Sequence, residues 1–313
     1  MKVFNKRSLA IVLVVALTLG LAGVVTTSHR AYAAQAPVDL QTAAPFAILS
    51  GTPNITDSPT SVITGNVGMS PAASSAIGLL CTQVTGIIYA IDGTGNPCFT
   101  VNAPLVVAAK GDLTAAYIDA AGRTPFSTVP TELGGTTKIP GVYTSGATTF
   151  GITAGAGPLV LDGQGDRNAV FIFEAGFSGT GLTVGPGSTV SLINGAQACN
   201  VFWKVDTASI NTTAVFKGSI LALNSISVAN GANIEGRLLA RNGNVTLIND
   251  TITLPVCTAG STTSTSTSTA VPGLPNTGIA PTPNSVSWKT ITPYVAVVAV
   301  GSLFYLARKK STS

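Results

Sequence analysis

The stretches ASINTTAVFKGSILA (208–222) and SISVANGANIEGRLLA (225–240) carry one β-type pattern. An apolar residue is flanked by Thr, Ser or Asn, a Gly-containing corner follows, and a second apolar run comes after it. The same pattern occurs at 54–68, 148–155 and 179–190. Repetition of one such unit predicts coils stacked along an axis, which is a β-solenoid. If each coil lays one strand on a common face, the flanking polar side chains form a regularly spaced array that faces solvent.

Period-two alternation predicts which side chains of each strand point inward and which point outward. Apolar residues such as Leu182, Ile210 and Ile226 are expected to point into the core. Their outward neighbours are small and polar: Asn54, Thr56, Thr149, Thr153, Thr183, Ser209, Asn211, Thr213, Ser225 and Ser227. This array is the candidate functional surface, although Thr also favours exposed strands through β-propensity alone.

One segment, residues 104–121 (PLVVAAKGDLTAAYIDAA), has helical character, because its apolar residues recur at three- and four-residue steps. Gly111 interrupts this pattern. We expect one helix packed along the outside of the solenoid. Two other runs, 170–173 and 201–203, are apolar on both faces, and we expect them to lie beneath that helix.

The first 33 residues are typical of a secretory signal peptide. Lys2, Lys6 and Arg7 precede an apolar run over 9–25, and Ala-Tyr-Ala at 31–33 supplies the small residues of a cleavage site. The protein is therefore expected to be exported, with the mature chain beginning directly after this segment.

The charge balance changes once the chain ends are set aside. Four of the 16 basic residues precede Ala34 and four follow Gly278, which leaves eight basic residues against 12 acidic ones. A net negative domain has no electrostatic basis for binding nucleic acid. The single histidine, His29, lies in the predicted signal peptide, so the mature chain would lack an imidazole for general-base or metal chemistry. We expect no metal site and no cofactor.

Four cysteines in an exported chain predict disulfides, for which three connectivities are possible. A Cys81–Cys98 bond would close a short excursion between coils. A Cys199–Cys257 bond would tie the last strand to an earlier coil. We favour these two pairs, and buried free thiols are the alternative.

The C-terminal region contains a five-residue motif: Leu274, Pro275, Asn276, Thr277 and Gly278. A polar spacer, an apolar stretch at 291–307 and the basic tail 308–310 follow it. These features in this order resemble the LPxTG sorting signal of Gram-positive-type surface proteins. The resemblance implies that a sortase cleaves between Thr277 and Gly278 and joins the threonine to peptidoglycan, which would leave the secreted protein anchored in the cell wall.

The apolar stretch is short for a bilayer-spanning helix, which usually needs about 20 residues. Contact with the membrane is therefore expected only in transit, and a plain membrane anchor is the alternative. The sequence thus predicts four segments: a signal peptide (1–33), a β-solenoid domain (34–256), a Ser/Thr-rich linker (257–273) and the sorting signal (274–313). The low-complexity linker cannot bury a core.

Several long runs resemble those of one known family, and they occur in the same order. The runs are FAILSG (46–51), TGNVGMSP (64–71), TAAYIDAAGRT (114–124), LVLDGQGDRNAVFIFEAG (159–176), VSLINGAQACNVFWKV (190–205), FKGSILALNSI (216–226) and GRLLARNGNVTLINDTIT (236–253). They are similar to the DUF3494 family of ice-binding proteins. The resemblance implies an all-β, discontinuous β-solenoid of roughly triangular section with one long α-helix alongside. Its first strand comes from the N-terminal part and is inserted beside later coils.

The resemblance also implies adsorption to ice crystals, with the outward polar residues as the contact surface. Neighbouring strands lie about 4.8 Å apart and same-face residues about 6.7 Å apart, so a flat face offers a two-dimensional lattice of short side chains. Thr suits such a lattice because its branched side chain is stiff at χ1. The candidate positions mix Thr with Ser and Asn, without a uniform Thr-x-Thr ladder, which predicts moderate activity.

Two functions of other classes remain as alternatives. A wall-anchored adhesin or glycan-binding module would need exposed aromatic platforms, but the aromatic residues are sparse and mostly sit in apolar runs. A polysaccharide-cleaving enzyme would need clustered acids, and the nearest candidates are Asp162, Asp166 and Glu174. The sequence Gly-Gln-Gly-Asp is more typical of a corner, so we expect no enzymatic activity.

Asn-x-Thr triplets also match a glycosylation pattern, at Asn54, Asn211, Asn244 and Asn249. A bacterial-type sorting signal makes that match uninformative.

Overall fold

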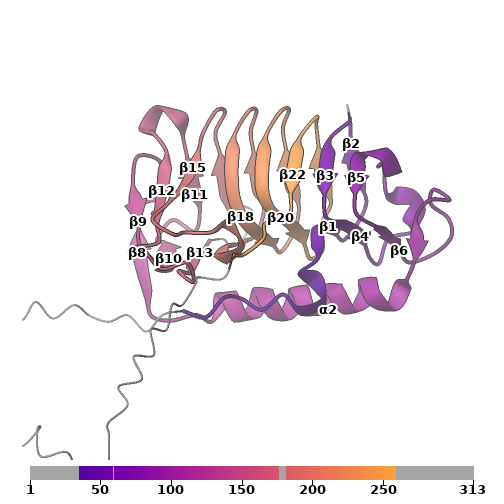
Figure 1. Cartoon of the computed structure of the whole chain (residues 1–313), viewed down its shortest axis with the longest axis horizontal. Coiled ribbons are helices and arrows are strands. Elements are labelled where there is room, and N and C mark those ends of the chain that lie inside the picture. The colour runs from indigo at the N-terminus through magenta and orange to yellow at the C-terminus, as the bar shows by residue number, and fades with distance from the viewer. Residues whose placement is uncertain (1–34, 59, 176–180, 259–313) are drawn as a thin grey trace, which may run out of the picture. The chain divides into compact units, whose positions relative to one another are not determined.

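The computed structural model describes residues 35–58, 60–175 and 181–258 (Figure 1). The predicted signal peptide, the sorting signal and the linker beyond Thr258 lie outside the described residues. Among the residues that the structure describes, no helix combines the length and apolarity that crossing a bilayer requires.

The described chain forms three parallel β-sheets. The 13-stranded sheet runs in the order β7 (Thr100–Val101), β6 (Ile88–Ala90), β4 (Asn66–Met69), β1 (Phe46–Ser50), β20 (Asn233–Ala240), β18 (Val215–Ala222), β16 (Val201–Val205), β13 (Phe171–Glu174), β10 (Gly141–Ser145) and β8 (Phe126–Val129). A branch of the same sheet leaves β20 through β22 (Thr251–Thr253), β3 (Val62–Thr64) and β5 (Val84–Thr85).

The six-stranded sheet contains β11 (Phe150–Ile152), β14 (Leu182–Val184), β17 (Ala208–Ile210), β19 (Ile226–Val228), β21 (Val245–Leu247) and β2 (Ile55–Asp57). The three-stranded sheet contains β15 (Val190–Ile193), β12 (Leu159–Asp162) and β9 (Thr137–Lys138). Short 3₁₀ helices occupy Gln41–Ala43, Ser74–Ala76, Cys81–Gln83, Ala154–Ala156 and Ala198–Asn200.

Consecutive strands visit the sheets in turn, so that β10, β11 and β12 make one coil and β13, β14 and β15 make the next. Strand β18 continues round a corner at Gly218. This residue has φ +112°, and a Cβ there would lie 2.8 Å from the carbonyl oxygen of Val201, so the corner requires glycine. The structure thereby confirms the prediction of a mostly β fold with parallel strands and one α-helix.

The N-terminal strands join the solenoid beside its last coil. Strand β1 lies between β4 and β20, β2 pairs with β21, and β3 pairs with β22. The family resemblance implied such an insertion. Strands β4, β6 and β7 then extend the stack, and the helix returns the chain along it before β8 begins (Figure 1).

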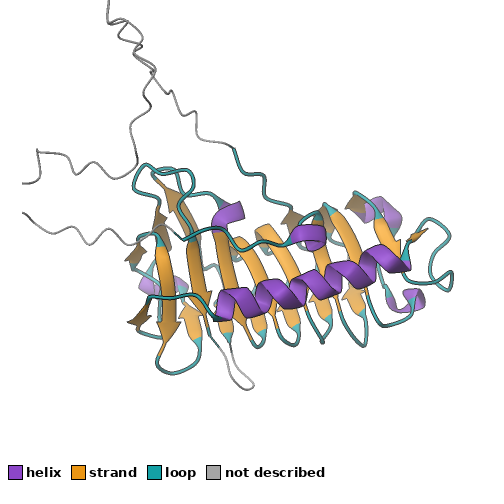
Figure 2. Ribbon diagram, turned by 90° about the horizontal axis from the view of Figure 1, so that it is seen from below, coloured by secondary structure: helices purple, strands orange, loops and turns teal. Residues whose placement is uncertain are grey.

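Helix α2 spans Ala103–Ala121, one residue longer than predicted. The Asn102 side chain accepts a hydrogen bond from the Leu105 backbone N–H at 3.2 Å, and Pro104 occupies the first turn. Gly111 does not interrupt the helix. It lies on the exposed side, where a Cβ would meet no atom within 4 Å. The opposite side packs against the 13-stranded sheet, where the buried helix residues are Val106, Ala109, Leu113, Ala116, Tyr117 and Ala120 (Figure 2).

Two hydrophobic cores explain the runs that are apolar on both faces. Phe171, Phe173 and Trp203 point into the solenoid core, where the rings of Phe173 and Trp203 stack at a centroid distance of 4.1 Å. Ile172 and Phe202 alternate with them and belong to the core beneath α2. The prediction that these runs lie under the helix is confirmed.

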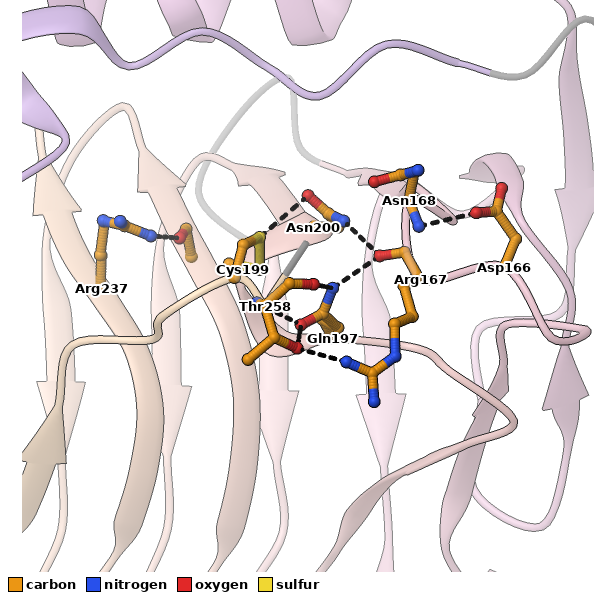
Figure 3. Close-up of a disulfide and its surroundings, with 10 residues drawn as sticks. Asp166, Arg167, Asn168, Gln197, Cys199, Asn200, Arg237 and Thr258 are labelled. Atoms are coloured by element: carbon orange, nitrogen blue, oxygen red, sulfur yellow. Dashed lines mark hydrogen bonds between the residues drawn. A yellow bond between two sulfur atoms is a disulfide. The ribbon is translucent and has the colours of Figure 1, made fainter. Parts of the chain in front are cut away.

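Both disulfides join the pairs favoured from the sequence, Cys81 with Cys98 and Cys199 with Cys257. Around Cys199 the C-terminal segment is also held by hydrogen bonds (Figure 3). The Thr258 backbone N–H donates to Gln197 Oε1 at 2.8 Å, and Arg167 Nη1 donates to Thr258 Oγ1 at 2.8 Å. The first two residues of the predicted linker, 257 and 258, therefore contact the solenoid.

Candidate functional site

The six-stranded sheet carries a row of small hydroxyl side chains on its outer face. Each of its strands is three residues long, with buried first and last residues in five of them and a less buried middle residue throughout. Parallel pairing brings the middle residues into register, in the order Gly151, Thr183, Ser209, Ser227, Thr246 and Thr56. We call the five hydroxyl residues of this series the hydroxyl row.

Polar residues two positions before and after the middle residue flank the hydroxyl row. Asn211 Nδ2 donates to the Val184 carbonyl at 2.8 Å, and Thr149 Oγ1 donates to the Gly181 carbonyl at 3.3 Å. Ser225 Oγ donates to Asn244 Oδ1 at 2.6 Å. These bonds link neighbouring coils and hold the flanking side chains in fixed positions.

The structure brings together nine of the ten sequence-predicted residues, on this sheet or at its edges. They are Asn54, Thr56, Thr149, Thr153, Thr183, Ser209, Asn211, Ser225 and Ser227. Sequence reasoning missed Thr246, which lies between Ser227 and Thr56. The signal was present, because Val245-Thr246-Leu247 has the same alternation as Leu182-Thr183-Val184.

Thr213 is a correction to the predicted set. Strand β17 ends at Ile210, and Thr213 lies in the turn that follows it, with φ +57°. Gly187, Gly231 and Asn249 occupy similar turns after β14, β19 and β21, and each also has a positive φ. The alternation rule failed there because the chain leaves the strand conformation at this corner, so counting in twos no longer predicts direction.

Among the described residues, the six strands of this sheet contain one charged residue, Asp57 at the end of β2, and Glu132 lies beside β11 at the opposite end. Glu132 accepts hydrogen bonds from the Thr153 backbone N–H at 3.1 Å and from Thr153 Oγ1 at 3.0 Å. Asp57 accepts hydrogen bonds from the Ser61 backbone N–H at 2.7 Å and from Ser61 Oγ at 2.8 Å. The hydroxyl row itself is uncharged.

The other two sheets offer different surfaces. Helix α2 covers the 13-stranded sheet (Figure 2). The N-terminal halves of β18 and β20 carry an ion pair between Lys217 and Glu235 at 2.7 Å, and Val62 and Ile193 are exposed on β3 and β15. The six-stranded sheet is therefore the one whose outer face combines small size, absence of charge and regular spacing.

The regular surface changes at β2. An open hollow of about 460 Å³ lies beside this strand, lined by Thr56, Asp57, Ser58, Gly78, Thr246, Leu247 and Ile248. The isolated bridge between Ile55 and Ile77 shows that the chain continues beyond β2 without a full strand. The regular part of the row consequently extends from β14 to the β21–β2 pair.

Two of the acids considered for catalysis, Asp162 and Asp166, accept hydrogen bonds from residues of the corners in which they lie. Asp162 Oδ1 accepts hydrogen bonds from the Gln164 backbone N–H at 2.8 Å and from Asn194 Nδ2 at 2.9 Å. Asp166 Oδ1 accepts one from the Asn168 backbone N–H at 2.8 Å. Both carboxylates thus support corners. Within the described ranges, no group of three or more His, Cys, Asp and Glu residues is placed to hold a metal ion.

A parallel β-solenoid with a helix on one side and a row of uncharged hydroxyl groups on another presents an extended and regular polar surface. Residues 48–253 match the family described as Ice-binding-like, and the chain belongs to that family. This confirms the family to which the sequence runs pointed.

Relatives named as ice-binding proteins share much of the chain. The protein from Flavobacterium frigoris (strain PS1) is 37% identical over 222 residues, which cover 70% of this chain and 76% of the relative. The protein from a Colwellia species is 38% identical over 224 residues, which cover 70% of this chain and 84% of the relative.

Solved structures show the same fold. An ice-binding protein from an Antarctic biological consortium has a TM-score of 0.60 and 34% identity, covering 71% of this chain and 93% of that one. The DUF3494 domain of a Shewanella frigidimarina ice-binding protein has a TM-score of 0.63 and 30% identity, covering 71% of this chain and 99% of that one.

Proposed function

We propose that this protein binds ice through the hydroxyl row and the polar residues that flank it. The observation that carries the proposal is the register of Thr183, Ser209, Ser227, Thr246 and Thr56 on one uncharged face. Neighbouring members are about 4.8 Å apart, since this is the spacing of paired strands. Small hydroxyl groups at a fixed repeat can hold water in an ordered layer, and the relatives named above are ice-binding proteins.

The entropy cost of binding is low because the surface is already ordered. Thr side chains are stiff at χ1. Several flanking groups already make hydrogen bonds to neighbouring coils, as Asn211 does to the Val184 carbonyl. Long Lys or Glu side chains would lose more freedom on contact with ice. Each water contact is weak, so the affinity comes from many contacts that form together.

A triangular section of the coils belongs to the same proposal. The three sheets follow one another along the chain, and in such a section each would form one side. The side bearing the hydroxyl row would then be flat over several coils, as contact with a crystal plane requires. Mixed Ser, Thr and Asn composition supports moderate freezing-point depression and clear inhibition of ice recrystallisation.

The test compares one substitution on two faces of the domain of residues 34–258, which keeps the Cys199–Cys257 pair. Thr183→Tyr places a bulky ring on the hydroxyl row, whereas Thr251→Tyr places the same ring on exposed Thr251 of β22. We expect unsubstituted protein to shape ice crystals and suppress recrystallisation at micromolar concentration. Thr183→Tyr should lower thermal hysteresis several-fold, and Thr251→Tyr should leave it unchanged. Round, unaltered crystals with the unsubstituted domain would reject ice binding, and loss only in Thr251→Tyr would move the site to the other face.

We further propose that the protein is secreted and attached to the cell wall through Thr277. The N-terminal signal features and the ordered features of residues 274–310 support this. Sortase and peptidoglycan would then be its other partners, with the membrane contacted only in transit. Thr277→Ala should convert wall-bound protein into protein that detergent extracts. Protein that still resists detergent, and is released only by cell-wall hydrolases, would contradict the proposed attachment.

The adhesin alternative has less support. Phe126 on β8 is the one exposed aromatic side chain among the described residues, and it lies at the edge of the 13-stranded sheet rather than on the six-stranded one. A single aromatic side chain does not make a stacking platform for a sugar chain.

A further inference from the structure

We propose that Asn244 is a positioning residue that fixes the direction of the hydroxyl groups at one end of the hydroxyl row. The inference rests on the proposed ice binding and deepens it. It assigns a role to two of the Asn-x-Thr triplets, Asn54-Ile55-Thr56 and Asn244-Val245-Thr246, which the pairing of β2 with β21 stacks in register.

Asn244 lies at the centre of a hydrogen-bonded chain that crosses three coils. Ser225 Oγ on the preceding coil donates to Asn244 Oδ1 at 2.6 Å. Asn244 Nδ2 donates to Thr246 Oγ1 at 3.0 Å. Thr56 Oγ1, on the N-terminal coil, donates to Thr246 Oγ1 at 3.3 Å. We call Ser225, Asn244, Thr246 and Thr56 the side-chain relay.

An amide gives the side-chain relay a direction, because its oxygen only accepts and its nitrogen only donates. The Ser225 hydroxyl must therefore donate its hydrogen bond to Asn244 Oδ1. Thr246 Oγ1 must accept from Asn244, and it also accepts from Thr56. Both lone pairs of Thr246 are then occupied, so its own O–H points to solvent. The hydroxyl protons of Ser225 and Thr56 are engaged in hydrogen bonds to Asn244 and Thr246, so these two oxygens present only lone pairs to solvent.

The exposed pattern is thus acceptor at Ser225, donor at Thr246 and acceptor at Thr56. A hydroxyl group without such partners rotates among several directions, and a water layer ordered against it would have to select one. Fixing the directions in advance removes that entropy cost. The first water layer must donate to Ser225 and Thr56 and accept from Thr246, a pattern that ice can satisfy because each of its water molecules both donates and accepts.

The position of the side-chain relay adds weight to this role. Thr56 and Thr246 are 190 residues apart along the chain, and they meet where the N-terminal coil stacks on the last C-terminal one. Backbone pairing alone sets the spacing of the row at this junction. The Thr56–Thr246 bond adds a fixed direction, and Asn244 determines which way that bond points.

The experiment uses Asn244→Asp, which keeps the shape of the side chain and replaces the amide N–H donor by an oxygen. An ionised carboxylate only accepts, so it takes protons from both Ser225 and Thr246 and removes the Thr246 O–H from solvent. A protonated carboxyl has a donor again and can restore the pattern. The pKa of an ordinary Asp is about 3.9. We expect thermal hysteresis of the full solenoid at least fivefold below that of the unsubstituted protein at pH 7, and within twofold of it at pH 3.

Asn230→Asp is the matched control, because Asn230 Oδ1 accepts a hydrogen bond from Asn249 Nδ2 at 3.1 Å at an exposed corner outside the row. It adds the same charge and needs no donor, so activity should match the unsubstituted protein at both pH values. The charged residues near the sheet, Asp57 and Glu132 at its ends and Asp206 and Arg241 just after β16 and β20, are the same in all variants. Comparison at each pH therefore cancels their effect.

Thr246→Val provides a second variant that keeps the branched shape and removes the donor. It should lose activity to the same extent as Asn244→Asp at pH 7, with no recovery at pH 3. The side-chain relay is overturned if Asn244→Asp is fully active at pH 7, if its loss persists at pH 3 with unchanged circular dichroism, or if Asn230→Asp loses as much. Failure of the unsubstituted protein to adsorb to ice would overturn the proposed function itself, and the relay with it.

Discussion

Ile48 and Leu238 are register partners on β1 and β20, and both side chains are completely buried. Ile48 belongs to the first coil in the sequence and Leu238 to the last. The first and last coils of the sequence are therefore held together here by strand pairing and side-chain packing. No covalent bond connects β1 to β20. Coils of a solenoid bury their cores only against neighbours, so each half of the chain depends on the other at this junction.

The first prediction tests the contribution of this junction to stability. Ile48→Ala should lower the free energy of unfolding by about 2–4 kcal/mol, because it leaves a cavity between β1 and β20. Val62→Ala is the matched control, since Val62 lies on the same coil but is 57% exposed. It should cost less than about 1 kcal/mol. Urea denaturation with both disulfides intact measures the two values, and similar losses would show that the junction is not tightly packed.

The second prediction concerns the corner residue Thr213. A β-branched residue at φ +57° is strained, and glycine adopts this conformation freely. Thr213→Gly should therefore raise the free energy of unfolding by about 1 kcal/mol. Thr212, its exposed neighbour, has no positive φ, so Thr212→Gly should lower stability instead. Chemical denaturation of both variants checks the opposite signs, and thermal hysteresis should stay constant because neither residue lies on the hydroxyl row.

Much of the fold follows from local patterns in the sequence. Three- and four-residue steps located α2, and runs apolar on both faces located the strands beneath it, because burial on two sides leaves no polar position in the run. The outward positions of Thr183, Ser209 and Ser227 followed from alternation within single strands. These patterns depend only on neighbouring residues.

Other features depend on where a strand ends or on distant pairing. Alternation carried past Ile210 treated Thr213 as a strand residue, whereas Thr213 lies in the turn after β17 with left-handed backbone geometry. The pairing of β1 with β20 joins segments far apart in sequence, so no local period could show it, and it came from family resemblance. The partners of Asn244 could not be predicted either, since one of them lies on the preceding coil.

A third prediction follows from Glu174 on β13, whose Oε1 is buried without a hydrogen-bond partner among the described residues. Burial raises the pKa of this carboxyl from 4.5 to about 7, and the nearby charge of Lys204 opposes the shift. Between pH 4.5 and 7 the folded protein then holds a proton that the unfolded chain has released. Stability should accordingly fall as pH rises through this window and level off above it.

Glu174→Gln should remove this part of the slope when the free energy of unfolding is measured by urea denaturation from pH 4.5 to 8. Burial also raises the pKa of Asp250 to about 6, so a smaller slope of the same sign should remain below pH 6 in the variant. Glu235→Gln, which removes a carboxylate from the part-exposed ion pair with Lys217, serves as the control and should keep the full slope. An unchanged slope in Glu174→Gln would exclude Glu174 as its source.

The last prediction concerns the bond between Cys199 and Cys257, which are 58 residues apart in sequence. A cross-link over a loop of this length stabilises by about 4 kcal/mol in the chain-entropy model, whereas the 17-residue separation of Cys81 and Cys98 gives about 3 kcal/mol. Replacing Cys199 and Cys257 by Ala should therefore lower the free energy of unfolding more than replacing Cys81 and Cys98 by Ala, as measured by urea denaturation.

The Cys199–Cys257 bond also restrains β22, which lies between β20 and β3 at the junction of the first and last coils. Its loss should speed amide hydrogen exchange at Ile252, while loss of the Cys81–Cys98 bond should not. Equal exchange at Ile252 in both variants would mean that β22 is held by its strand partners alone.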